Sequence, residues 1–153
     1  MINNERNPSL VRLDVFLGEW RVEALIPLLQ FTPIDGRCEF EWALDGQFLL
    51  QRTEVSHPDA PDSLAIISLG TDEDSFIQHY YDARGVVRVY GMSFRENVLT
   101  LLRDSPDFSP LLFSQRFTAV FSEDGSTIEG KWEISHDGSS WEDDFHLRYV
   151  KVS

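Results

Sequence analysis

The sequence predicts an all-β protein, an antiparallel up-and-down barrel of about ten strands with a short helix at its N-terminus. Apolar and polar residues alternate along most of the chain after residue 18, which is the pattern of strands with one buried face. Turn signals rich in Asp, Asn and Gly separate these runs at short intervals. Helical segments between the strands, which a parallel sheet would need, are not indicated. The strands are therefore expected to follow one another as hairpins.

The predicted helix starts at Ser9, which can cap its first turn. Leu10, Leu13 and Phe16 or Leu17 then recur at helical spacing, so that one side of the helix is apolar. We expect this side to plug or flank one end of the barrel.

The first strand opens on the Gly-x-Trp sequence of residues 18–20, after which Trp20, Val22 and Ala24 alternate with charged residues. Later turn signals lie at residues 44–47, 72–75, 82–85, 95–98, 123–126 and 136–139. Asp-Gly between alternating apolar runs is the strongest short hairpin signal, and a two-residue loop fixes which side chains share a face.

Three Asp-Gly pairs predict the inner face of the barrel. Centring a loop on residues 124–125 places Phe117 opposite Trp132, and the loop at 137–138 adds the last strand to the same face. That strand should contribute Trp141, Phe145, Leu147 and Tyr149. The loop at 45–46 places Gln51 and Thr53 inside with Phe40 and Trp42. We therefore predict an aromatic interior with a few polar groups.

The middle of the chain carries the candidate binding chemistry. If both turns there are of even length, His79 and Tyr81 share a face with Arg88, Tyr90 and Arg103. Two guanidiniums inside a barrel need a paired acid or a bound anion, because an unpaired buried charge is costly. The opposite face of the same strands is equally apolar, and the alternative that it faces inward stays open. In either case one apolar face remains outside, and we expect it to form a homodimer.

The length of 153 residues fits one domain that can bury a sizeable core. We assign residues 1–8 to a loose N-terminal tail and residues 9–153 to a single barrel domain. Cys38 is the only cysteine, so no internal disulfide is expected, and its parity with aromatic neighbours predicts a buried, inert thiol.

The chain is strongly acidic, with a formal net charge of −13 from 26 acidic and 13 basic residues. Nucleic acids and anionic membrane surfaces are therefore not expected partners, because both are recognised through positive charge. No apolar run reaches the roughly 20 residues that span a bilayer. The polar N-terminus lacks the apolar core of a signal peptide. We expect a cytoplasmic protein.

The Gly-x-Trp start and the strand pair that follows the Asp-Gly-x-x-Trp sequence of residues 137–141 resemble the calycin barrels, the superfamily of lipocalins and fatty-acid-binding proteins. More narrowly, residues 13–152 resemble bacterial domains of the DUF1579 group, which implies a barrel but no settled activity. The resemblance also implies that a cation of the last strand packs on Trp20 and closes the barrel. Lys151, favoured by its parity, or Arg148 would serve.

Haem-binding barrels of the nitrobindin type share the Gly-x-Trp start and hold iron through a histidine near the C-terminus, which suggests His146. Its parity places it on the outer face, so a haem cofactor is a secondary hypothesis. Motifs of hydrolases, metalloproteases and phosphate-binding loops are lacking, and the four histidines show no metal-ligand spacing. Residues 104–110, rich in Pro and Ser, form either a lid or a plain connector.

These observations predict a binding module that holds a small hydrophobic or amphipathic molecule, anionic if the arginines face inward. Its predicted ligand-contacting residues are His79, Tyr81, Arg88, Tyr90, Arg103, Gln51, Thr53, Trp42, Phe117 and Trp132. The alternatives are a haem protein, a small-molecule enzyme using His79 and Tyr81 as acid–base groups, and a dimeric interaction scaffold.

Overall fold

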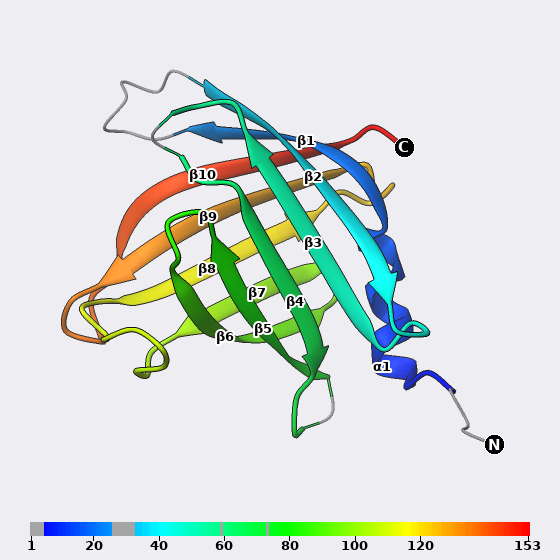
Figure 1. Ribbon diagram of the computed structural model, residues 1–153, viewed down its shortest axis with the longest axis horizontal. Coiled ribbons are helices and arrows are strands. Elements are labelled where there is room, and N and C mark those ends of the chain that lie inside the picture. The colour runs from blue at the N-terminus through cyan, green and yellow to red at the C-terminus, as the bar shows by residue number, and fades with distance from the viewer. Residues whose placement is uncertain (1–4, 26–32, 59, 73) are drawn as a thin grey trace.

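The computed structural model describes residues 5–25, 33–58, 60–72 and 74–153. The chain forms one short α-helix, one 3-10 helix and ten strands in these residues, shown in Figure 1. They are α1 (Pro8–Val11), η1 (Arg12–Phe16), β1 (Gly18–Leu25), β2 (Pro33–Ala43), β3 (Phe48–Val55), β4 (Ser63–Leu69), β5 (Ser75–Asp82), β6 (Val87–Arg95), β7 (Val98–Arg103), β8 (Ser114–Phe121), β9 (Thr127–Ser135) and β10 (Glu142–Lys151).

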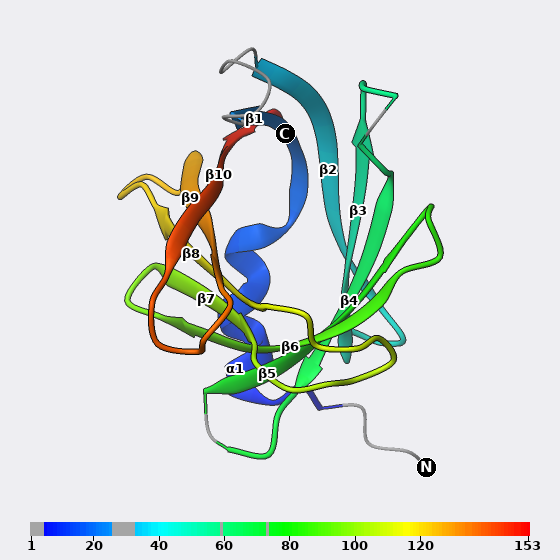
Figure 2. The same ribbon diagram turned by 90° about the vertical axis from the view of Figure 1, so that its left-hand side faces the viewer.

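The ten strands form one closed antiparallel barrel in which every strand pairs with its neighbours in sequence and β1 pairs with β10. The predicted all-β fold is thereby confirmed. We name the two ends of the barrel by what lies there. The helix end carries α1, η1 and the turns at residues 44–47 and 96–97, and the loop end carries residues 56–58 and 60–62 and the connections at 83–86, 104–113 and 136–141. In Figure 2, the helical segment is visible between the strands of the barrel.

The hairpins predicted from two of the Asp-Gly pairs have the expected faces. Phe117 pairs with Trp132 across β8 and β9. Gln51 pairs with Phe40 across β2 and β3, which places Gln51 on the inner face. Register follows from the loop because side chains alternate with a period of two.

The turn between β5 and β6 is odd, and it corrects the predicted face of β5. Tyr80 pairs with Arg88, so the loop between the strands holds three residues, 83–85. The amide of Gly85 donates to the carbonyl of Asp82 at 2.9 Å, and Gly85 takes a φ of 81°, which is the left-handed residue of such a loop. His79 and Tyr81 therefore lie on the outer face, and the expectation that they share the face of Arg88 is wrong.

A β-bulge corrects the prediction for Trp141. The register between β9 and β10 shifts between Asp143 and Phe145, so one extra residue reverses the alternation there. Phe145 pairs with Trp132 inside the barrel, as predicted. Trp141 instead packs on the guanidinium of Arg116, which lies 4.2 Å from its ring centroid and belongs to the outer face.

The helical segment plugs the barrel as predicted, with Leu10, Leu13 and Phe16 buried. Its cap differs from the prediction, because the side chain of Asn7 accepts the hydrogen bond from the amide of Ser9. Within the described part of the chain, residues 5–7 precede the helix and contact its end of the barrel.

Arg6 anchors that segment to the helix end. It lies 4.3 Å from the Trp42 ring centroid, and its Nη2 is 3.1 Å from Asp14 Oδ1. The indole of Trp42 donates to the same oxygen at 2.8 Å. Trp42 is therefore held at the helix end by these two partners.

Trp20 lies at the centre of the helix end and is fully buried. Its Nε1 donates to the carbonyl of Phe16 at 2.8 Å, and Lys151 Nζ lies 5.5 Å from its ring centroid. The cation expected on this tryptophan is thus Lys151. Arg148 lies outside the barrel, where its Nε is 3.6 Å from Glu129.

Candidate functional site

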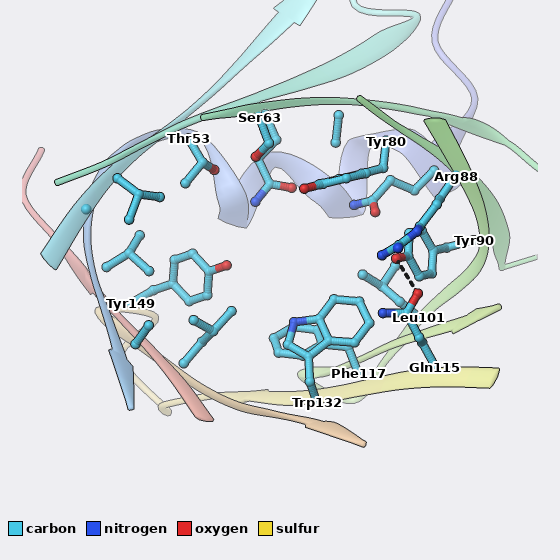
Figure 3. A pocket seen from close by; sticks show the side chains of 18 of the residues that line it. Thr53, Ser63, Tyr80, Arg88, Tyr90, Leu101, Gln115, Phe117, Trp132 and Tyr149 are labelled. Carbon is cyan, nitrogen blue, oxygen red and sulfur yellow. Dashed lines mark hydrogen bonds between the residues drawn. The ribbon is translucent and has the colours of Figure 1, made fainter. Parts of the chain in front are cut away.

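A cavity of about 530 Å³ occupies the barrel between the helical plug and the loop end, and Figure 3 shows part of its lining. Its volume is that of a typical small-molecule site. The described residues that line it are Phe16, Val22, Ala24, Ile34, Gly36, Phe40, Gln51, Thr53, Val55, Ala60, Pro61, Ser63, Ala65, Ile67, Gln78, Tyr80, Arg84, Arg88, Tyr90, Met92, Leu99, Leu101, Phe113, Gln115, Phe117, Ile128, Trp132, Asp144, Phe145, Leu147 and Tyr149.

One side of the cavity is largely apolar and aromatic. Phe117 and Trp132 are stacked with centroids 4.9 Å apart, and Phe145 continues the stack behind Trp132 at 6.3 Å. Gly130 is needed for this packing, because a Cβ there would lie 2.4 Å from the Phe117 ring. These side chains form a continuous apolar surface against which an apolar ligand can pack.

The other side is polar and is formed by the adjacent strands β3 to β6. A single row of paired residues crosses all four strands: Gln51 pairs with Ala65, Ala65 with Tyr80, and Tyr80 with Arg88. Thr53 and Ser63 pair one step nearer the loop end. We call the set Gln51, Thr53, Ser63, Gln78, Tyr80 and Arg88 the polar wall. In Figure 3, its labelled members lie across the cavity from Trp132 and Phe117.

Arg88 is the charged group of the polar wall, and its charge is not neutralised by the described residues. Its Nε is buried without a hydrogen-bond partner. No carboxylate of the described chain lies within ion-pair distance of it. The neighbouring Tyr90 hydroxyl donates to Gln115 Oε1 at 3.1 Å. A half-buried guanidinium with a buried, unsatisfied Nε favours an anionic ligand, because leaving the charge unpaired is costly.

Arg84 lines the loop end of the cavity but differs from Arg88 in being paired. Its Nη2 lies 2.8 Å from Asp82 Oδ2, and the same carboxylate accepts from the Tyr80 hydroxyl at 2.9 Å. These bonds fix Tyr80, a member of the polar wall, and leave Arg84 little charge to offer a ligand.

Arg103 was expected to contact the ligand in the cavity. Its side chain instead forms an ion pair with a residue of the connection that follows β7. Its Nε and Nη2 donate to the two oxygens of Asp107, each at 2.9 Å. Asp107 also accepts from the backbone amide of Val89 at 2.8 Å, and so covers the edge of β6 beyond the end of β7. The pair is buried and fixes this connection, the segment predicted as lid or connector, to the barrel wall.

The tyrosines of the cavity remain protonated at neutral pH. Burial raises the pKa of Tyr80 and Tyr149, and that of Tyr90 as well. Each hydroxyl therefore keeps its proton, which Tyr80 donates to Asp82 and Tyr90 donates to Gln115. Burial also raises the pKa of Asp144, at the loop end of the cavity, above its ordinary value.

Of the ten residues predicted to contact a ligand, six line the cavity: Gln51, Thr53, Arg88, Tyr90, Phe117 and Trp132. Trp42 and Arg103 face inward but are bound at the barrel ends, and His79 and Tyr81 lie outside. Sequence reasoning missed Gln78, Tyr80 and Gln115. Their parity with Phe76 and Phe117 was a usable signal, but for Gln78 and Tyr80 it was obscured by the odd turn.

A haem site built on His146 does not fit the fold. The side chain of His146 is half exposed on the outer face, where His146 and Lys131 are register partners across β10 and β9. None of the described residues that line the cavity is a histidine. In the described residues there is also no group of three or more His, Cys, Asp and Glu side chains that could hold a metal ion.

Comparison with known proteins supports the fold alone. The chain is similar to the crystal structure of Rv2717c from M. tuberculosis, with a TM-score of 0.65 and 12% sequence identity over 97% of this chain and 100% of that one. No family model matches the chain, and no curated protein does so either. The resemblance to the DUF1579 group therefore stays a prediction. None of the helices in the described residues has the length and apolar character needed to cross a membrane.

Proposed function

We propose that this chain binds a small amphipathic molecule with an anionic group inside its barrel. The observation that carries the proposal is Arg88, a cation on the cavity wall with a buried Nε that no described residue satisfies. An anion with two oxygens suits a guanidinium, which offers its donors as a planar fork. The Gln115 carboxamide, whose NH₂ donors are not used by Tyr90, lies beside it and can complete the site.

The rest of the cavity supports a ligand with an apolar body. The stacked rings of Phe117 and Trp132 line one side, and Leu101 and Leu147 extend the apolar lining. Mostly apolar walls with a few oriented polar groups are the usual composition of small-molecule sites. The acidic chain would slow the approach of an anion, and added salt should speed it by screening that repulsion.

The test is displacement of anilinonaphthalene sulfonate, an aromatic anion whose fluorescence reports an apolar site, by dodecanoate. We expect the dye to bind wild type and Arg88→Met to raise its Kd at least about tenfold, because a charge-assisted bond is lost. Arg116→Met is the matched control, because that guanidinium packs on Trp141 outside the barrel. Equal affinity in wild type and Arg88→Met would contradict the proposal, as would a failure of dodecanoate to compete.

The expected homodimer stays a prediction. The outer faces of β4 to β6 carry Ile66, Ile77 and Val89 in neighbouring register positions, around His79. Native mass spectrometry of the purified chain would report the mass of the assembly and any small molecule that purifies with it.

A further inference from the structure

We infer, on the basis of the proposed function, that the ligand is a facially amphipathic acid: a rigid body with one apolar face and further hydrogen-bonding groups along its opposite edge. A chain with a single polar head group would use Arg88 but not the rest of the polar wall. The inference depends on how the polar groups are distributed and on which of them lack a partner.

The polar wall extends well beyond the Arg88 site. From Arg88 it runs through Tyr80 to Gln51 across four strands, with Ala65 as the only apolar member of that row. Ala65 is also small, so the wall is recessed at its middle and leaves room for a ligand edge. Thr53 broadens the wall toward the loop end.

Several groups of this wall have no hydrogen-bond partner for their side chains in the described protein. Gln78 is 6% exposed, yet its carboxamide makes no hydrogen bond to a described residue. The same holds for the hydroxyl of Ser63. Beside Arg88, Gln115 uses Oε1 for the Tyr90 hydroxyl, and its NH₂ donors have no partner among the described residues. A core built for apolar filling alone would not place these groups together, because buried polar groups are normally satisfied.

The wall opposite is apolar and continuous. Phe117, Trp132 and Phe145 pack on one another along this side of the cavity, and Leu147 adds to it. A fused-ring skeleton covers such a surface with little loss of internal freedom, since rigidity lowers the entropy lost on binding. Its polar edge would then meet Gln78 and Ser63, the wall groups without a partner among the described residues.

The experiment compares three acids as competitors of anilinonaphthalene sulfonate below their micelle concentrations: cholate, 5β-cholanate and palmitate. Cholate carries hydroxyls on one face of a fused-ring acid, cholanate is the same skeleton without them, and palmitate is a single-headed chain. We expect cholate to bind at least about tenfold more tightly than cholanate, because a site built to hydrogen-bond a substrate discriminates against the analogue that lacks the groups.

Variants of the polar wall test whether its residues are the ones that bind the cholate hydroxyls. Gln78→Leu combined with Thr53→Val should weaken cholate at least about tenfold and leave palmitate within about twofold, because only cholate loses hydrogen bonds. Thr118→Val is the matched control, since Thr118 pairs with Lys131 on the outer face. Thermal unfolding of each variant verifies that it is folded, and Ser63→Ala is a milder alternative if the double variant is not.

The outcomes separate this inference from the proposed function. If palmitate or cholanate binds as tightly as cholate, and Arg88→Met still weakens all three, the inference is wrong and the proposed function stands. Equal loss of cholate in the wall variant and in Thr118→Val would also overturn it. If no acid displaces the dye, the proposed function itself fails.

Discussion

The helix end and the loop end of this barrel are made by the same ten strands, yet they differ in how their polar groups are treated. At the helix end the indole of Trp20 and that of Trp42 each have a hydrogen-bond acceptor, and aromatic rings fill the interior. Toward the loop end the interior is hollow, Arg88 Nε is buried without a hydrogen-bond partner, and the Gln78 carboxamide has none among the described residues. Stability is therefore concentrated at one end, which frees the other to carry polar groups that only a ligand can satisfy.

The largest expected effect is at the helix end. Trp20→Ala should lower the free energy of unfolding by about 3–5 kcal/mol, because it empties a fully buried site. Trp132→Ala, in the cavity wall, should cost about 1–3 kcal/mol, since one side of this ring already borders a cavity. Urea unfolding followed by circular dichroism measures both. Similar losses for the two variants would remove the contrast between the ends.

The buried ion pair is the exception at the loop end, and it sharpens the comparison. Asp107→Asn should cost about 3–5 kcal/mol, because it leaves the Arg103 guanidinium buried without its counter-charge.

The same pair predicts a loss of stability in acid. The Arg103 guanidinium holds the pKa of Asp107 well below its usual range, so this carboxylate stabilises the fold above its unfolded pKa of about 3.9. That stability should be lost progressively as the pH falls below about 4. Unfolding measured at pH 7 and at pH 3 should therefore show a smaller acid loss in Asp107→Asn than in wild type. An identical pH dependence would mean that the pair does not contribute.

Replacing Arg88 should not lower the free energy of unfolding, in contrast to replacing a residue that supports the fold. Without ligand, Arg88→Met is expected to leave the free energy of unfolding unchanged or to raise it by about 1 kcal/mol, because an unpaired charge leaves the cavity wall. Chemical unfolding in the absence and presence of dodecanoate tests this, and wild type alone should gain stability from the acid. A destabilised apo-protein would show that Arg88 supports the fold.

The smallest effect concerns the closure of the helix end. Lys151→Met should cost about 0.5–1 kcal/mol through the lost cation–π contact with Trp20. Arg148→Met, in the same strand but outside, should change stability by less than about 0.5 kcal/mol. Differential scanning calorimetry can resolve the two, and equal shifts in Tm would argue against a role of Lys151 in closing the barrel.

The sequence predicts this fold well because its hairpins are strongly marked. Asp124-Gly125 fixes the pairing of Phe117 with Trp132, and every strand after it inherits a face from that register. The buried Cys38 was predicted in the same way, from parity alone, and burial raises its pKa to about 11.

The site was harder to predict because it depends on single residues that shift the alternation. The turn at residues 82–85 and the bulge near Asp143 each add one residue, which carries His79 and Trp141 to the outer face. Such irregularities have no distinct hydrophobic pattern of their own. The pairing of Arg103 with Asp107 was also out of reach, since both lie around a connection without periodicity.

The three-residue turn at 83–85 has a consequence for how this barrel can diverge. Loss or gain of a single codon there would exchange the two faces of β5 relative to β6, sending Tyr80 to solvent and bringing His79 toward the interior. Point substitutions at Ala83 or Arg84 carry no such penalty. Descendants of this gene should therefore conserve whether the loop length is odd or even more strictly than any residue within it.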